Sequence, residues 1–263
     1  MATDPMHAWA GACAGAPRAS GSEDHRSPRD LNRLLSALPA EVVDAWGDRL
    51  EPVELERGQV LIESGAVVSQ AWFPTTAVVS MQYLTEDGHA SEVAVVGSEG
   101  LIGIPLFMGG GSTPGRAAVA MAGQAFRLPG VDLRNAFRES LPVMAVLLRY
   151  TQALIAHMAQ TAVCNRHHAI EQQLSRWLLL MLDRHQGEEL RATQEQIALM
   201  LGVRREGVTE AALHLQRDGL IRYQRGHIHV LDRTGLQLHC CECYAIVKAE
   251  YDRLLPAPSP DRG

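Results

Sequence analysis

The spacing of hydrophobic and polar residues changes twice along the chain. A helical period runs from about Leu31 to Gly47. Short β-type segments, separated by Gly, Pro and Asp, then extend to Leu128. Helical spacing returns at Val131 and governs most of the remaining chain. The pattern therefore predicts an α+β protein in which a β-rich part precedes an α-rich part.

The β-rich part predicts a jelly-roll β-barrel, because several short strands with regular turns are typical of that architecture. Thr85-Glu86-Asp87-Gly88 has the composition of a hairpin turn. The Gly-rich segment 109–115 predicts a mobile loop. The expected strands are Val53–Leu55, Val60–Glu63, Ala71–Phe73, Val78–Leu84, Glu92–Val96, Ala117–Met121 and Ala125–Leu128.

A long helix with an apolar seam is expected next. Ser140 and Pro142 are typical of a helix start, and the pattern continues to about Ala162. Apolar residues recur at alternating steps of four and three, which is heptad spacing. Such a seam would bury itself against a second copy of the chain; packing on the chain's own barrel is the alternative. The seam consists of Met144, Leu148, Thr151, Ile155, Met158 and Ala162.

Two further helices are expected in the α-rich part. One covers Arg166–Arg184 and should connect the barrel to a second domain. The other covers about Thr234–Leu254 and ends the folded chain. The inward face of the connecting helix is expected to hold Leu174, Trp177, Leu178 and Met181.

Between these two helices, the stretch 193–230 has the pattern of a winged helix-turn-helix. Thr193 and Gln196 have the capping-box spacing that starts a helix. Gly202 stands where the chain must turn sharply, and Val203 can fill the corner. The apolar face of the short first helix is formed by Ile197, Ala198 and Leu201.

The second helix of this motif is predicted over about Arg204–Arg217, with Val208, Ala212 and Leu215 facing inward. The first turn of a recognition helix reaches base edges in the major groove. Arg can donate two hydrogen bonds to guanine, and Glu can accept one from cytosine. The alternative is an ordinary helical hairpin whose solvated face carries charge. The residues left facing outward are Arg204, Arg205, Glu206, Thr209 and Glu210.

Base reading is assigned to Arg205 and Glu206, whereas Arg204 and Thr209 are better placed for phosphates. A wing follows, because residues 220–223 and 227–230 alternate apolar and polar around the turn Gln224-Arg225-Gly226. Arg222 and Arg225 are expected to reach the DNA backbone. Residues 191–233 hold seven Arg and five acidic residues, a net of +2, whereas the whole chain carries −6 and the remainder therefore −8.

Length and composition place these elements in a globular, cytoplasmic protein. A chain of 263 residues can hold two domains, and 46% of its residues are hydrophobic. Neither a membrane-spanning run nor a secretory signal is expected, so no membrane partner is predicted. The expected divisions are a disordered tail (1–28), a barrel (29–138), a dimerisation helix (139–163), a winged domain with an extra helix (164–255) and a tail (256–263).

The five cysteines show no regular pairing and fit a reducing compartment. On one helix, Cys240 and Cys243 would lie one turn apart, where they could bind a metal, form a disulfide or act as a redox sensor. The favoured interpretation treats Cys240, Cys241 and Cys243 as small, partly buried hydrophobes. The segment Cys164–His168 is another possible ligand group, but histidines that cap a helix junction are preferred. No metal site and no cofactor are predicted.

A barrel, a seam helix and a winged helix-turn-helix, in that order, resemble the Crp/Fnr family of bacterial transcription regulators over residues 31–232. Gly202, Arg205, Glu206 and Val208 match the family's Gly-x-x-Arg-Glu-x-Val pattern. The cyclic-AMP receptor branch has a second Arg where this chain has Glu210, so the DNA half-site is expected to differ. The resemblance implies a homodimer on a palindromic DNA site, with RNA polymerase as a further partner.

The barrel departs from the branch of the family that binds cyclic nucleotides. That branch has Gly-Glu-x-Gly, a spacer and then Arg-Ser/Thr-Ala, in which Glu binds the ribose and Arg the cyclic phosphate. Gly103 and Arg116 fit this pattern, but Ile104 or Pro105 replaces the Glu and Ala117 replaces the hydroxyl. Cyclic AMP is therefore disfavoured as the effector. Arg116 binds another anion or is a surface residue, and both alternatives stay open.

An enzyme is not predicted. Jelly-roll enzymes need several histidines and a carboxylate inside the barrel, and His89 is the only histidine between residues 50 and 130. The function expected from the sequence is a sequence-specific transcription regulator, controlled by a signal at the barrel or competent without ligand. The alternative is a redox or small-molecule sensor that acts through protein partners.

Overall fold

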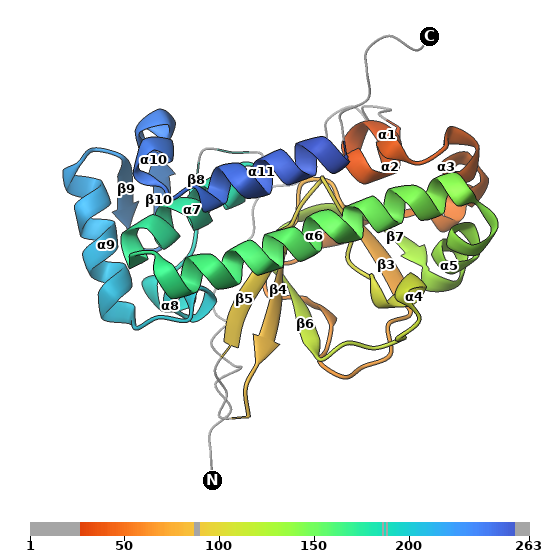
Figure 1. Cartoon of the computed structure of the whole chain (residues 1–263), viewed down its shortest axis with the longest axis horizontal. Coiled ribbons are helices and arrows are strands. Elements are labelled where there is room, and N and C mark those ends of the chain that lie inside the picture. Colours follow the sequence, from red (N-terminus) through yellow and green to blue (C-terminus); the bar gives the residue numbers. More distant parts are fainter. Residues whose placement is uncertain (1–26, 87–89, 186, 188, 256–263) are drawn as a thin grey trace.

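The computed structural model describes residues 27–86, 90–185, 187 and 189–255. Seven strands form two antiparallel sheets in the orders β1-β7-β3 and β2-β6-β4-β5 (Figure 1). All seven predicted strands are confirmed, with ends that move by at most two residues. They are β1 (Glu51–Leu55), β2 (Val60–Ile62), β3 (Gln70–Pro74), β4 (Val78–Leu84), β5 (Ala90–Val96), β6 (Gly115–Met121) and β7 (Gly123–Pro129).

The two sheets close on each other where the chain passes directly from β6 into β7. A Cβ atom on Gly123 would lie 2.5 Å from the backbone nitrogen of Ala77, so only glycine fits this corner. β4 and β5 pair antiparallel, as the predicted hairpin requires, although Asp87, Gly88 and His89 lie outside the described residues. The expected tails lie largely outside them too, since residues 1–26 and 256–263 are not described.

The helical pattern from Leu31 to Gly47 forms several short helices, which are separated at buried Asn32 and at Leu38-Pro39. The Asn32 side-chain oxygen caps the next helix by accepting from the nitrogen of Leu35. Its amide nitrogen donates to the carbonyls of Pro74 and Gly100 at 2.8 and 3.0 Å. Asn32 thereby ties the N-terminal helices to the barrel. These helices are α1 (Pro28–Leu31), α2 (Arg33–Ala37) and α3 (Ala40–Trp46), followed by the 3-10 turn η2 (Gly47–Arg49).

The long helix α6 (Leu141–His167) lies across the barrel and reaches the second domain (Figure 1). It begins at the Ser140 N-cap, as predicted, but continues five residues beyond Ala162. The Tyr150 hydroxyl donates to the carbonyl of Leu101 at 2.8 Å, and the ring lies where a side chain on Gly100 would clash. The inner face of α6 is thus fixed on the barrel. Two shorter helices, α4 (Pro105–Met108) and α5 (Gly130–Glu139), precede it.

Within the described residues, α6 is the one helix that is long and apolar enough to cross a membrane by length and composition alone. The buried share of its most apolar 18-residue window is 44%. Packing on the barrel therefore accounts for part of this apolar character, and the outward side of the helix accounts for the rest.

The second domain combines helices with a small sheet of order β8-β10-β9. The connecting helix begins at Ile170 instead of Arg166, because α6 continues to His167 and ends at a His168 cap. The final helix is split, because the chain leaves helical geometry at Cys240. The elements are α7 (Ile170–Leu182), β8 (Glu189–Arg191), α8 (Gln194–Leu201), α9 (Arg205–Arg217), β9 (Ile221–Gln224), β10 (His227–Val230), α10 (Arg233–His239) and α11 (Cys243–Leu254).

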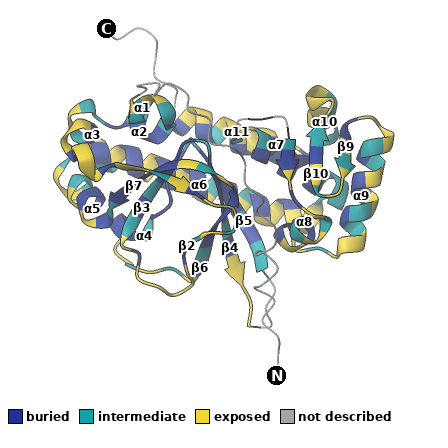
Figure 2. Ribbon diagram, turned by 180° about the vertical axis from the view of Figure 1, so that it is seen from behind, coloured by how far each residue is buried: buried dark blue, intermediate teal, exposed yellow. Residues whose placement is uncertain are grey.

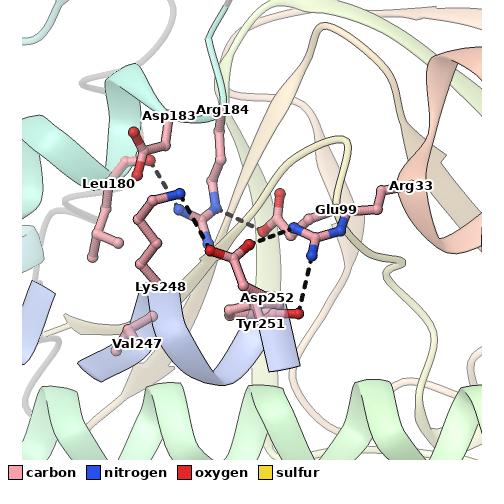
Figure 3. A pocket seen from close by; sticks show the side chains of 9 residues that line it. All are labelled: Arg33, Glu99, Leu180, Asp183, Arg184, Val247, Lys248, Tyr251 and Asp252. Carbon is pink, nitrogen blue, oxygen red and sulfur yellow. Dashed lines mark hydrogen bonds and ion pairs between the residues drawn. The ribbon is translucent and has the colours of Figure 1, made fainter. Parts of the chain in front are cut away.

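The C-terminal helix α11 runs back along α6 and joins three parts of the molecule (Figure 1). Figure 3 shows its end at a polar junction with the N-terminal helices and the end of α7. Asp252 pairs with Arg33 at 3.1 Å, and the Arg184 guanidinium lies over the ring of Tyr251. Arg184 also pairs with Glu99 of the barrel at 2.7 Å. This junction holds α7, α11 and the N-terminal helices against the barrel.

Candidate nucleic-acid interface

The helix-turn-helix forms as predicted. The Thr193 hydroxyl oxygen accepts from the nitrogen of Gln196 at 3.2 Å, and the Gln196 side chain accepts from the nitrogen of Thr193 at 2.9 Å. This reciprocal capping box starts α8. Gly202 ends α8 in the left-handed region, with φ of +66°, and half-buried Val203 packs against the core.

The recognition helix α9 is seated by its inward face. Val208, Ala212 and Leu215 are buried, as their spacing predicts. A Cβ atom on Gly207 would lie 2.6 Å from the Ile170 side chain, so this glycine lets α9 approach α7 closely. The sequence analysis did not identify that role, since a glycine inside a helical pattern has no local signal for interhelical contact. The close approach fixes the direction in which α9 presents its outer face.

The outer face of α9 carries four exposed predicted residues, namely Arg204, Arg205, Glu206 and Glu210. Figure 2 shows α9 at the end of the molecule opposite α1 and α3. Thr209 differs, because it is half-buried and its hydroxyl lies 2.8 Å from Gln194 Oε1 and 3.0 Å from the carbonyl of Arg205. A phosphate contact by Thr209 would require one of these bonds to break. In this structure Thr209 positions α9 against α8.

The wing is a two-stranded hairpin with a tighter turn than predicted. Gln224 belongs to β9, and the turn consists of Arg225 and Gly226, both with positive φ (51° and 84°). Arg222 and Arg225 are exposed. The third strand, β8, has no clear alternation in the sequence and was not predicted. Its Glu189 lies 2.6 Å from His227, so it orients the first residue of β10.

The barrel and α6 enclose a cavity of about 390 Å³ that is lined by Gly103, Arg116 and Ala117, the three predicted ligand-site residues. The Arg116 side chain is mostly buried, and its Nε lies 3.5 Å from the Glu63 carboxylate. Ile104 and Pro105 line the cavity where the nucleotide-binding pattern has its Glu. The Gly-rich loop forms one wall, where its carbonyls at Gly111 and Thr113 accept hydrogen bonds from the backbone nitrogens of Val68 and Gly65. Among the described residues, the lining is mostly apolar, with Arg116 as its one charged side chain and Gln82, Ser112 and Thr113 as further polar groups.

The seam of α6 is divided by the structure between two faces. Leu148 and Ile155 point outward, with 44% and 60% of their surface exposed. Thr151 is buried and donates to the carbonyl of Leu147, so it faces the chain's own core. Met144 and Met158 are half-buried. Of the predicted seam, only Leu148, Ile155 and Ala162 are exposed. Together with Leu141, which the prediction did not include, they form an outward stripe at every seventh residue of α6.

A buried carboxyl joins the barrel to the DNA-binding end. Glu92 of β5 accepts from the Ser80 hydroxyl at 2.5 Å and from Trp177 Nε1 of α7 at 3.1 Å. Burial raises the pKa of Glu92 to about 7, although these hydrogen bonds and the charges of Arg176 and Arg184 act in the opposite direction. The sequence analysis did not single out Glu92. Its signal is one carboxylate inside an otherwise apolar strand.

The cysteine interpretation needs one correction. Cys240 caps the end of α10 and Cys243 begins α11, so the two do not share a helical face. Cys243 instead lies beside Cys241 and beside two residues from about 75 positions earlier in the chain, Cys164 and His168. The four described cysteines are free thiols.

The comparisons with known proteins agree with this architecture. Residues 172–238 match the family model described as a Crp-like helix-turn-helix domain. The chain is Crp/Fnr-like. A crp/fnr-family transcriptional regulator from Eubacterium rectale superposes with a TM-score of 0.64 at 16% identity, covering 80% of this chain and 98% of that one.

Two further solved structures show the same Crp/Fnr fold. FixK2 from Bradyrhizobium japonicum has a TM-score of 0.63 at 16% identity, covering 73% of this chain and 98% of its own. A CRP/FNR-family regulator from Thermus thermophilus has a TM-score of 0.60 at 24% identity, with coverage of 72% and 97%. No curated protein sequence matches the chain. The structures from Eubacterium rectale and Thermus thermophilus are described as transcriptional regulators.

Proposed function

We propose that this Crp/Fnr-like protein is a cytoplasmic transcription regulator that binds a palindromic duplex DNA site as a homodimer. The observation that carries the proposal is the exposed Arg205-Glu206 pair at the start of a recognition helix that is seated on α7 and α8. A helix held in this way can enter the major groove with its first turn against base edges.

The proposed contacts follow from the position of each side chain. Arg205 and Glu206 read bases, and Glu210, one turn further along α9, limits which bases are accepted. Arg204, Arg222 and Arg225 hold phosphates on either side of the groove. Bound near a promoter, the dimer would have RNA polymerase as its further partner.

Control through the barrel is part of the proposal. The cavity lies against Thr151, Leu154, Ile155 and Met158 of α6, so a ligand there would contact the helix that is proposed to set the distance between two recognition helices. Its apolar wall with one arginine fits an apolar molecule that carries one anionic group, better than cyclic AMP. The alternative to control by a ligand is a dimer that binds its DNA site without any ligand.

Selection of the purified full-length protein on random duplex DNA, at near-physiological salt and with or without cyclic AMP, tests the proposal. We expect a two-fold symmetric motif without the nucleotide. A motif that needs cyclic AMP would overturn the inference about the cavity. If a folded, dimeric protein enriches no DNA sequence, it does not bind DNA specifically under these conditions. The protein would then need another effector or have a different function.

Arg205→Ala is expected to weaken binding to the selected site by about 1–3 kcal/mol and to relax the preference at one base pair of each half-site. The reason is the loss of a bidentate contact with one base. Fluorescence anisotropy on the site and on its single-base variants measures the effect. Arg217→Ala, at the far end of α9, is the matched control and should leave base preference unchanged. A uniform loss across all sequences would show that Arg205 contacts phosphate only.

A further inference from the structure

Three cysteines and one histidine meet where α6 ends and α11 begins. Cys164 and His168 are one turn apart at the end of α6, and Cys241 and Cys243 flank the start of α11. Their four ligand atoms, one from each residue, all lie within 4.8 Å of one another. The three thiols are buried and form a small cluster of their own, separate from the main core.

Two separations between these atoms are close to those of a tetrahedron around one ion, and all the others are below 4.8 Å. The sulfurs of Cys164 and Cys241 are 3.6 Å apart, and the sulfur of Cys243 is 3.4 Å from Nδ1 of His168. Zinc bonds of about 2.3 Å to sulfur and about 2.0–2.1 Å to nitrogen, at tetrahedral angles, place ligand atoms roughly 3.5–3.8 Å apart. A disulfide would instead need sulfurs about 2.05 Å apart. The arrangement has room for a metal ion between the ligands.

The surrounding groups suit a metal-bound histidine and thiolate. With Nδ1 of His168 turned to the cluster, its Nε2 lies 3.4 Å from the Glu242 carboxylate. A carboxylate at the second nitrogen fixes the tautomer and orientation of a ligating imidazole. The Gln160 amide nitrogen donates to the sulfur of Cys243 at 3.1 Å, which stabilises negative charge on that sulfur.

Charge balance adds an independent observation. Three thiolates, one neutral histidine and one divalent cation carry a net charge of −1. The guanidinium of Arg176 is 5% exposed and close enough for its charge to act on Cys164 and Cys240. Its Nε has no hydrogen-bond partner among the described residues. A buried cation at this position compensates for a negatively charged metal centre.

We propose that Cys164, His168, Cys241 and Cys243 bind one Zn²⁺ ion and fasten the end of α6 to the start of α11. Soft sulfur donors with one imidazole select zinc over magnesium or calcium. The compact ligand set accommodates one ion, because a cluster of several irons would spread its ligands further apart. On binding, each thiol that is still protonated releases its proton to solvent, and no electron is transferred.

The metal would act on the geometry of the whole protein. It would lock the α6–α7 hinge at one end of α11, while the ion pair of Asp252 with Arg33 holds the other end. α11 then becomes a rigid strap between the hinge and the N-terminal helices. All four ligands come from the protein, which leaves no open coordination position, so the site is structural.

Metal content of the untagged full-length protein, purified with reductant and without chelator, tests the proposal directly. We expect one zinc per chain by inductively coupled plasma mass spectrometry. Cys164→Ser, Cys243→Ser and His168→Ala should each lower zinc retention by at least about tenfold, the scale expected when a direct ligand is lost. Cys240→Ser and His167→Ala are the matched controls and should keep one equivalent, because neither residue belongs to the ligand set.

A second measurement covers variants that fail to fold. Removal of zinc from the wild-type protein with a strong chelator should lower its Tm by on the order of 5–10 °C, and added zinc should restore it. Less than a tenth of an equivalent of zinc after reconstitution, a Tm indifferent to the chelator, or loss of zinc from Cys240→Ser would overturn the assignment. A Cys164–Cys241 disulfide in reduced preparations would do the same. None of these readouts requires DNA, so the result is independent of the proposed function.

Discussion

Replacing Ile155 with Asp is expected to convert the proposed homodimer into a monomer. Ile155 is 60% exposed at the middle of the outward stripe of α6, so two copies of the helix would bury it against each other. The substitution places two uncompensated carboxylates in that apolar contact. Because each buried charge costs several kcal/mol, the dimer dissociation constant should rise by on the order of 1,000-fold or more. Sedimentation velocity at micromolar protein measures the change.

DNA affinity should fall together with dimerisation, because a monomer contacts only one half of a palindrome. Leu238→Asp is the matched control, since Leu238 is 85% exposed on α10, away from the stripe. It should leave both the dimer and DNA binding intact. An Ile155→Asp protein that stays dimeric would show that the subunits associate through another surface, and the outward stripe of α6 would then need a different explanation.

The sequence was sufficient for the elements whose signals are local. The seven barrel strands follow from short alternating segments between turn residues, and the capping box at Thr193 and Gln196 fixes the start of α8. Gly202 marks the turn, because few other residues tolerate its left-handed backbone. The sequence also predicted that Arg205 and Glu206 face solvent, because the helical period of the apolar residues determines which side of α9 is buried.

The remaining features depend on contacts between distant parts of the chain. Heptad spacing identified an apolar stripe on α6 but not its direction, because the barrel takes up Thr151 on the inner side. The helical period near Leu31 did not show the break at Asn32, because Asn32 bonds to the barrel carbonyls of Pro74 and Gly100, which lie far along the sequence. β8 is too short to show a period and forms only by pairing with β10.

The cysteine cluster shows the same limit most clearly. Its two halves come from residues 164–168 and 241–243, and neither half has a complete metal-binding pattern in the sequence. The Cys-x-x-Cys spacing in the sequence pairs Cys243 with Cys240, but Cys240 is not one of the four residues in the cluster. The two halves meet only because α11 packs back along α6. That packing is a long-range tertiary contact, which local sequence patterns do not indicate.

Glu92→Gln is expected to remove a pH-dependent loss of stability. Burial raises the pKa of Glu92 from 4.5 to about 7, so the folded state holds this proton where the unfolded chain releases it. Stability from the neutral carboxyl is complete below pH 4.5 and is lost as the pH rises through 7. The shift corresponds to about 3 kcal/mol, of which roughly 2–3 kcal/mol should disappear between pH 5 and pH 8. Glutamine imitates the neutral acid, because its carbonyl can accept from Trp177 and its amide can donate to Ser80.

Urea unfolding of both proteins at pH 5 and pH 8 measures this effect as a difference of differences, in which the contributions of other titrating groups cancel. Glu54→Gln, on the exposed side of β1, is the matched control and should follow the wild type at both pH values. If the free energy of unfolding changes equally between pH 5 and pH 8 in the wild type and in Glu92→Gln, Glu92 is already ionised in the fold and paired with Arg176 or Arg184. If the expected difference is found, ionisation above neutral pH destabilises the fold, because it leaves a charge in the buried interface between β5 and α7, even though the hydrogen bond from Trp177 favours that charge.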